Sequence, residues 1–222
     1  MRLLVTAVLC AAVAGCASAK PQARVAAPPP VLRGPTPEEQ AQVDAVLAPL
    51  VSASGICSPA GSCAVGLAIE SVRRIHVAAG PAPPKKFVIR ITTGALSNLE
   101  PSELQAALAH ELGHVQLGHF ETRQVRRLAE PPMNAGSNGS SEDALRINRA
   151  SDREEELAAD LYAVELLDRL PGRPGHGCAT MLLLLERLDL EQLTPGWANW
   201  LSTHPTPAAR LQTLQAECDK KP

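Results

Sequence analysis

The chain has 222 residues, with 21 Lys and Arg against 23 Asp and Glu and a formal net charge of −2. Its basic residues are scattered along the sequence, which excludes the concentrated positive surface of a nucleic-acid-binding protein. Hydrophobic residues make up 45% of the chain but aromatic residues only 2%. A globular core must therefore be built from Leu, Val, Ile and Ala.

The first 16 residues have the pattern of an export signal. A single Arg precedes an apolar stretch from Leu3 to about Val13, which is too short to span a membrane. The following Val13-Ala14-Gly15-Cys16 is similar to a bacterial lipobox, in which cleavage before the Cys leaves that Cys acylated. The alternative is an ordinary signal peptide cleaved after Ala17-Ser18-Ala19. We expect a lipoprotein signal peptide over residues 1–15 and lipidation at Cys16, because several acyl chains give stable anchoring.

This lipid anchor is the only membrane contact that the sequence predicts. Ala17, directly after Cys16, stands where an Asp is typical of inner-membrane retention. We therefore expect an exported, periplasmic protein anchored to the outer membrane. Residues 16–36 comprise the lipidated Cys and a tether rich in Pro and Ala. Residues 37–222 are long enough for a single domain with its own core.

Residues 37–222 alternate between strand and helix patterns. Thr36 and Pro37 are typical of a helix start, and segments rich in Val and Ile favour strands. The predicted elements are a helix from Pro37 to about Val51, strands at Cys63–Glu70, Arg74–Ala79 and Lys86–Thr92, and helices from Pro101 to about Leu128, from Ser141 or Ser151 to before Pro171, from Gly177 to Leu190, and from Pro207 onward. Residues 131–140, rich in Pro, Gly, Ser and Asn, predict a mobile loop.

The helix that begins at Pro101 contains an HExxH motif, His110-Glu111-Leu112-Gly113-His114. Two residues four positions apart lie about 40° apart around a helix, so both imidazoles can face one metal ion. Glu111 lies beside them, where it can act as a general base without binding the metal. The alternative is two surface histidines on an ordinary helix, but this motif is rare in a chain with only 6 His.

A third metal ligand must come from elsewhere in the chain. Metzincin peptidases have a Gly and a His at positions that are occupied here by Leu117 and Phe120. His119 is about half a turn from His110, so it points away from the metal unless Gly118 breaks the helix. We treat His119 as a structural residue.

The helix that ends before Pro171 can supply this third ligand. Glu156 and Asp160 are one turn apart on one face, and Ala159 leaves room for a close helix approach. We expect Glu156 to complete the metal site and Asp160 to hydrogen-bond a ligand imidazole from behind. The neighbouring Glu154 and Glu155 are expected on a solvated face.

Three ordered motifs resemble one known family. They are the HExxH of residues 110–114, the ExxAD from Glu156 to Asp160, and Ser202-Thr203-His204-Pro205 followed by Arg210. Together they resemble the HtpX-like gluzincin zinc metallopeptidase family, which includes the type I CaaX prenyl endopeptidase, BepA and LoiP. The resemblance extends from about Glu38 to Leu214.

The resemblance implies an α+β fold: a mostly helical zincin-type peptidase domain with a small N-terminal β-sheet packed beside the HExxH helix. It also implies one zinc ion per chain on His110, His114 and Glu156, with Glu111 as the base. His204 and Arg210 match a pair that stabilises the transition state, although in some members the His instead occupies the metal. The sequence differs from the family pattern at residues 74–81, where relatives commonly have an edge strand that contains Asn-Ala.

If Cys16 is acylated and the signal removed, four cysteines remain: Cys57, Cys63, Cys178 and Cys218. An even number in an exported protein predicts disulfides. The local pairing is Cys57 with Cys63, which leaves Cys178 for Cys218.

The sequence thus predicts a zinc metalloendopeptidase whose substrates are proteins or peptides of the bacterial cell envelope, with a role in periplasmic or outer-membrane protein quality control. The alternative is a zinc-binding chaperone or assembly factor that cleaves little because His204 caps the metal. The presence of Glu111 argues for the enzyme.

Overall fold

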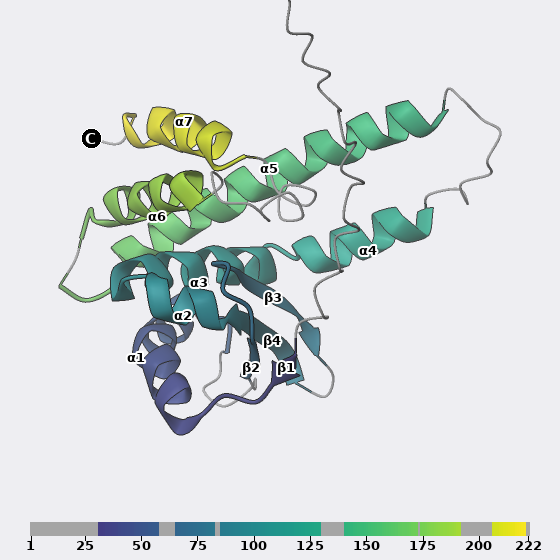
Figure 1. The fold of residues 1–222 in the computed structure, drawn as a ribbon. Helices are drawn as coiled ribbons and strands as arrows, with labels where there is room; N and C mark the ends of the chain where they lie inside the picture. The colour runs from purple at the N-terminus through teal and green to yellow at the C-terminus, as the bar shows by residue number, and fades with distance from the viewer. Residues whose placement is uncertain are drawn as a thin grey trace, which may run out of the picture.

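The computed structural model describes residues 31–57, 65–82, 85–129, 140–172, 174–191 and 206–220. A small mixed sheet lies on one side of the molecule and helices make up the rest (Figure 1). This arrangement confirms the α+β class and the mostly helical architecture that the sequence predicts.

The described chain begins with a two-residue strand, β1 (Leu32–Arg33), which leads into helix α1 (Pro37–Ser54). Thr36 caps this helix by accepting a hydrogen bond from the Glu39 amide, and the Glu39 carboxylate accepts the Thr36 amide in return. The Arg33 guanidinium pairs with the same carboxylate at 2.6 Å. The last part of the expected tether therefore has regular structure, because residues 32–33 form a strand that pairs with the sheet.

The sheet contains β2 (Val65–Glu70), β3 (Val77–Ala82) and β4 (Lys85–Thr92) in the order β1-β2-β4-β3. Strands β2 and β4 are parallel, whereas β3 runs antiparallel to β4 and forms an edge of the sheet. The three predicted strands are present with ends shifted by up to three residues. The edge strand β3 packs on the helix that carries the HExxH motif.

After the short helix α2 (Thr93–Asn98), Pro101 opens α3 (Pro101–Gln116) as predicted. Leu104, Leu108 and Leu112 form a fully buried stripe on α3. This stripe anchors the helix in the core, so the HExxH residues lie between the sheet and the remaining helices.

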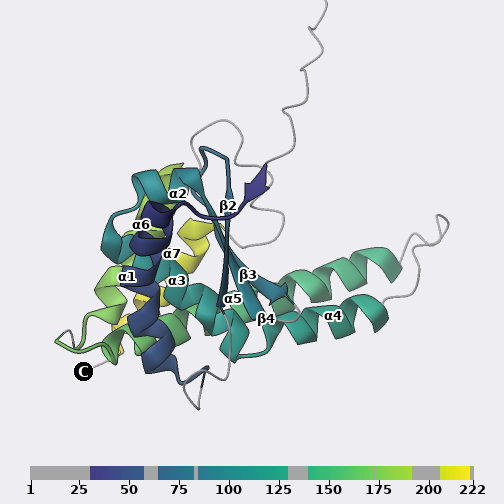
Figure 2. The same cartoon turned by 90° about the horizontal axis from the view of Figure 1, so that it is seen from below.

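The predicted helix to about Leu128 is in fact two helices. It breaks at Leu117 and Gly118, and α4 (His119–Ala129) follows. Gly118 has a positive φ of 69°, a conformation that glycine adopts without steric cost. In both views, α4 and the N-terminal part of α5 (Ser140–Asp168) run side by side away from the sheet (Figures 1 and 2).

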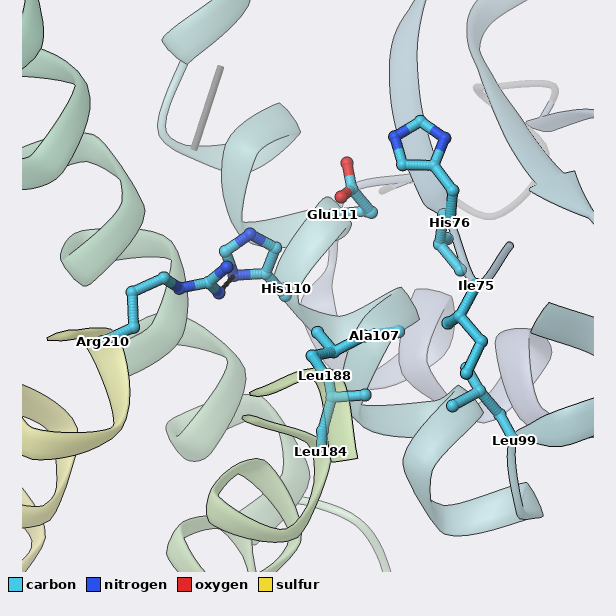
Figure 3. Close-up of a pocket in the computed structure, with 10 residues that line it drawn as sticks. Ile75, His76, Leu99, Ala107, His110, Glu111, Leu184, Leu188 and Arg210 are labelled. Carbon is cyan, nitrogen blue, oxygen red and sulfur yellow. Dashed lines mark hydrogen bonds between the residues drawn. The ribbon is translucent and has the colours of Figure 1, made fainter. Parts of the chain in front are cut away.

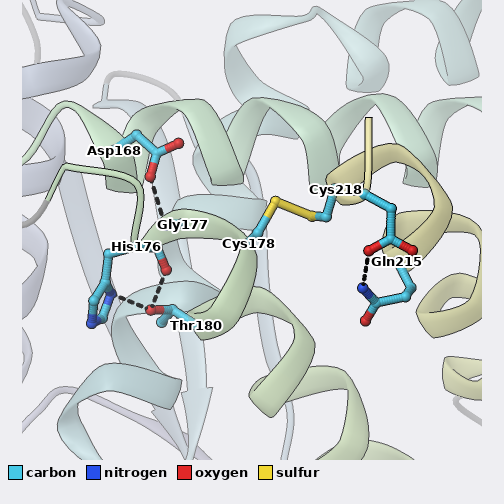
Figure 4. Close-up of a disulfide and its surroundings, with 8 residues drawn as sticks. Asp168, His176, Gly177, Cys178, Thr180, Gln215 and Cys218 are labelled. Carbon is cyan, nitrogen blue, oxygen red and sulfur yellow. Dashed lines mark hydrogen bonds between the residues drawn. A yellow bond between two sulfur atoms is a disulfide. The ribbon is translucent and has the colours of Figure 1, made fainter. Parts of the chain in front are cut away.

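The C-terminal helices α6 (Gly177–Glu191) and α7 (Pro207–Cys218) pack against each other and on α5. A disulfide joins Cys178 at the start of α6 to Cys218 at the end of α7, with Cα atoms 5.9 Å apart (Figure 4). This confirms one predicted pairing. Cys57 is also disulfide-bonded, but Cys63 lies outside the described residues, so its pairing stays a prediction.

The core is built almost entirely from aliphatic side chains, as the composition requires, and Phe87 is its one large aromatic member among the described residues. None of the described helices combines the length and the apolar character needed to cross a lipid bilayer. The predicted lipidation site Cys16 and residues 131–139 of the loop predicted at 131–140 lie outside the described residues, whereas Ser140 begins α5.

Candidate metal centre

Helices α3 and α5 bring three potential metal ligands to one buried point. His110 and His114 come from α3 and Glu156 from α5, and each is less than 6% exposed. The Nε2 atoms of the two imidazoles are 3.1 Å apart. One carboxylate oxygen of Glu156 lies 3.3 Å from His110 Nε2, and the other lies 3.3 Å from His114 Nε2.

These distances fit a tetrahedral zinc site. Zinc bonds to histidine nitrogen and carboxylate oxygen are about 2.0–2.2 Å long, so neighbouring ligand atoms in a tetrahedron are about 3.3–3.5 Å apart. The two Nε2 atoms lie 3.1 Å apart, and each of them lies 3.3 Å from a different oxygen of Glu156. Two His and one Glu also form a donor set that catalytic zinc sites use, with a fourth position for water or substrate. The residues present therefore fit a zinc ion.

A close helix crossing allows this convergence. A Cβ atom on Gly113 would lie 3.0 Å from the backbone oxygen of Ala159, so no larger residue fits there without a shift. Gly113 is part of the HExxH motif, and Ala159 follows Glu156 by three residues. The small side chains at the crossing thus allow α5 to deliver Glu156 to the two histidines.

The second ring nitrogen of His110 faces a buried ion pair. Its Nδ1 lies 2.8 Å from Asp160 Oδ1, and Arg210 donates to both Asp160 oxygens through Nε and Nη2. Because Asp160 is held as an ionised acceptor, it accepts a hydrogen bond from the Nδ1–H of His110. The Nε2 lone pair then faces Glu156 and His114, as metal binding requires.

His114 is held in the same way by His119. The two Nδ1 atoms are 2.8 Å apart, and His119 is only 7% exposed. Burial and the nearby His114 lower the pKa of His119 to about 4, so its ring is neutral. With a metal on Nε2 of His114, the Nδ1–H of His114 would donate to Nδ1 of His119. The helix break at Gly118 turns His119 towards the site, contrary to the direction expected for one continuous helix.

Arg123 on α4 connects the metal-site carboxylate to a neighbouring acid. Its Nε lies 2.7 Å from Glu155 and its Nη2 lies 3.1 Å from Glu156. The prediction that Glu155 faces solvent was wrong, because the side chain is buried and paired with Arg123. Glu154 is exposed, as predicted.

The electrostatics of the centre favour a cation. Burial and Arg210 both lower the pKa of His110, yet the carboxylates of Asp160 and Glu156 outweigh them and raise it to about 9. The His110 and His114 contacts hold the pKa of Glu156 far below its ordinary value despite burial. The same negative potential that would hold a proton on His110 attracts a metal ion.

Glu111 has the environment of a general base. It is 7% exposed, and one carboxylate oxygen accepts a hydrogen bond of 2.7 Å from the Ala79 amide on β3. Burial raises the pKa of Glu111 to about 7, against the lowering effects of His110 and the Ala79 amide. A carboxylate with a pKa near neutrality can both accept and release a proton at physiological pH.

Not every expected site residue is described. The structure brings His110, Glu111, His114, Glu156, Asp160 and Arg210 together, whereas His204 lies outside the described residues. Sequence reasoning missed the contacts of His119, of Arg123 and of the Ala79 amide. For His119, the sequence signal that was available is the Gly118-His119 pair, because a helix break there brings His119 back to His114.

Comparison with known proteins agrees with this geometry. A stretch of 50 residues is 44% identical to "Protease HtpX homolog 2" of Methanosarcina acetivorans; it covers 22% of this chain and only 17% of that protein. The family model of peptidase family M48 matches residues 37–218, which include every described residue of the centre. The chain therefore belongs to peptidase family M48.

Proposed function

We propose that the protein is a zinc-dependent metalloendopeptidase. The observation that carries the proposal is the buried cluster of His110, His114 and Glu156, whose potential ligand atoms all lie within 4.8 Å of one another, with Glu111 beside it. A structural zinc site would instead favour a closed set of Cys-rich ligands.

The chain's own residues divide the work of hydrolysis. A bound zinc ion supplies Lewis acidity that polarises the substrate carbonyl and acidifies a water. Glu111 accepts the water's proton through Oε1, because its Oε2 is held by the Ala79 amide, and passes that proton to the leaving amine. Arg210 keeps Asp160 ionised and so keeps the His110 ring in the binding tautomer. His204 is proposed to support the oxyanion.

We propose that an extended substrate peptide binds along the edge strand β3. Its Ala79 amide bonds to Glu111, so a peptide lying along β3 would pass the base. Strand addition relies on main-chain hydrogen bonds, which do not depend on the Asn-Ala sequence that residues 74–81 lack. The position of β3 at the edge of the sheet therefore favours protein or peptide substrates.

The proposed place of action is the bacterial cell envelope, with the chain exported and lipid-anchored through Cys16 at the periplasmic face of the outer membrane. The Cys178–Cys218 disulfide supports an oxidising compartment. Within the proposal, the substrates are envelope proteins and the role is their quality control. A zinc-binding assembly factor is the alternative, and the buried Glu111 beside the proposed metal ligands favours hydrolysis over it.

Substitutions of Glu111 and of Glu156 should impair the protein in different ways. Glu111→Gln keeps the shape of the site but cannot take a proton, so zinc should stay near one ion per chain while casein hydrolysis falls by at least about 10²-fold. Glu156→Ala removes a ligand, so zinc itself should be lost. Metal analysis beside a casein assay separates the two variants.

Glu154→Ala is the matched control, because this exposed acid lies on the same helix two residues from Glu156. It should keep both zinc and activity. Full zinc content in Glu156→Ala would show that another residue is the third ligand. Full hydrolysis by Glu111→Gln would show that Glu111 is not the general base.

A further inference from the structure

Glu156, the metal ligand proposed on α5, has an arginine beside each of its carboxylate oxygens. The side chain is fully buried. Its Oε1 accepts a hydrogen bond of 3.1 Å from Arg123 Nη2, and its Oε2 lies 3.5 Å from Arg210 Nη1. The Arg210 guanidinium also lies beside the His110 ring (Figure 3). The two oxygens of one carboxylate are therefore contacted from two different helices, α4 and α7.

Arg123 is itself fixed by a second acid. Its Nε lies 2.7 Å from Glu155 Oε2, so one guanidinium spans two consecutive residues of α5. Glu155 is buried, and the Arg123 side chain is only 24% exposed. Because the guanidinium is planar and rigid, fixing its Nε also fixes the direction of its Nη2. Glu155 therefore sets the place of Arg123, and Arg123 sets the plane of the Glu156 carboxylate.

The charges of Arg123 and Glu155 make orientation the main effect of this contact. The two groups form a close ion pair, so their opposite charges largely cancel at the distance of the metal centre. An arginine without such a partner would repel a metal ion from the site. With Glu155 in place, Arg123 can hold the ligand carboxylate at little electrostatic cost to cation binding.

Helix α4 supports two of the three proposed ligands from one of its faces. Arg123 follows His119 by four residues, so both side chains lie on the same side of the helix, one turn apart. His119 contacts His114 through the two Nδ1 atoms at 2.8 Å, and Arg123 contacts Glu156. The neighbouring positions on α4 are exposed: Glu121, Thr122, Gln124 and Val125.

We propose that Arg123 is a positioning residue of the metal centre, which orients Glu156 for zinc and makes the geometry of the centre depend on the docking of α4. This inference rests on the proposed zinc-peptidase function, in which Glu156 is a ligand. Arg123 acts through Glu156 and not on the substrate. The alternative is that Arg123 only provides the buried Glu155 with a counter-charge.

Zinc affinity distinguishes orientation from simple charge pairing. Arg123→Met keeps a long side chain but has no N–H groups, so zinc affinity in a chelator competition assay should fall by about 10–100-fold. Adding Glu155→Gln removes the acid that Arg123→Met leaves without its guanidinium. The double variant should regain thermal stability in the metal-free state but not zinc affinity. Wild-type zinc affinity in the double variant would show that Arg123 serves only to pair Glu155.

Arg123→Lys tests how far a conservative change restores the site. The lysine keeps the charge and can pair with Glu155, but an ammonium group lacks the rigid fork that spans both acids. Its zinc affinity should lie between those of the wild type and Arg123→Met. Affinity as low as in Arg123→Met would still require the fork, whereas full wild-type affinity would show that charge alone is sufficient and would overturn the proposal.

The visible spectrum of the cobalt(II)-loaded protein reports the geometry of the ligands directly. At saturating cobalt, Arg123→Met should shift or weaken the d–d bands, because the Glu156 carboxylate is no longer held in one plane. A variant that had lost only stability would keep the wild-type spectrum. An unchanged spectrum in Arg123→Met therefore overturns the proposal.

Arg169→Met/Glu165→Gln is the matched control, because it removes an exposed Arg–Glu pair of 3.3 Å at the end of α5. It should keep the wild-type zinc affinity and cobalt spectrum. Both measurements follow metal binding and not hydrolysis, so they also separate this inference from the proposed function. A wild type that binds zinc but cleaves no casein would contradict the peptidase, whereas normal cleavage with an unchanged spectrum in Arg123→Met would contradict only the role of Arg123.

Discussion

Each metal-facing imidazole in this protein is oriented by a different kind of partner. His110 is held by the Asp160 carboxylate, which is itself fixed by Arg210, whereas His114 is held by the neutral ring of His119. The two arrangements would have the same effect in the metal-bound protein, because each offers an acceptor to the Nδ1–H of a ring whose Nε2 binds the metal. They differ in strength, since a charged acceptor forms the stronger hydrogen bond.

Removing the His119 acceptor should weaken metal binding without removing a ligand. In His119→Leu, the Nδ1–H group of His114 loses its buried partner, and zinc affinity should fall by about 10–100-fold. A chelator competition assay at constant pH measures the change.

Two further variants give this measurement its controls. His119→Asn keeps an acceptor and should restore part of the affinity. His176→Leu removes an exposed histidine near the start of α6 and should leave zinc affinity unchanged. Equal affinity in His119→Leu and the wild type would show that His119 does not orient His114.

At the level of the elements, the centre depends on how closely two helices approach. The α3 helix carries two ligands and α5 the third, and the contact between them runs through Gly113 and Ala159. The space is limited by backbone atoms of Ala159, which cannot rotate away as a side chain could. The separation of these helices therefore sets the geometry of the metal site.

Gly113→Ala tests this dependence. The added methyl group would lie 3.0–3.1 Å from Ala159 backbone atoms, so α5 should move outward and Glu156 with it. Zinc affinity should fall by at least about tenfold, although alanine favours the helix by about 1 kcal/mol over glycine. The measurement is zinc affinity beside thermal unfolding of the metal-free protein. A variant that is more stable and binds zinc as well as the wild type would contradict the role of the crossing.

The elements that were predictable from the sequence are those whose pattern is local. The α3 start at Pro101 and the strands β2 to β4 follow from capping residues and runs of Val and Ile, and they appear with small shifts at their ends. The break at Gly118 was not predictable, because an isolated Gly is tolerated inside a helical pattern and only packing decides whether it adopts a positive φ. The Arg123–Glu155 pair joins residues 32 positions apart, so no local sequence pattern predicts it.

At the scale of the whole molecule, the Cys178–Cys218 disulfide closes the α6–α7 unit over a separation of 40 residues. A loop of that length predicts a contribution of about 4 kcal/mol to the free energy of unfolding. The double variant Cys178→Ser/Cys218→Ser should be destabilised by about this amount in urea unfolding, and zinc affinity should also fall because α7 carries Arg210.

Arg210→Lys in the intact disulfide background separates these two effects. It keeps the charge but loses the forked contact with Asp160, so it should weaken zinc binding with the disulfide in place. If the double Ser variant unfolds like the wild type, the disulfide does not stabilise the domain.

The buried pair of Asp160 and Arg210 also has a consequence for the cooperativity of folding. Arg210 follows Asp160 by 50 residues and lies on α7, so a partly folded chain in which α7 is not yet packed leaves Asp160 without its guanidinium partner. In such a state the acid behind His110 has no buried counter-charge, and burying it alone is unfavourable. We therefore expect the centre to form together with the packing of α7, so that a partly folded chain does not carry a complete site.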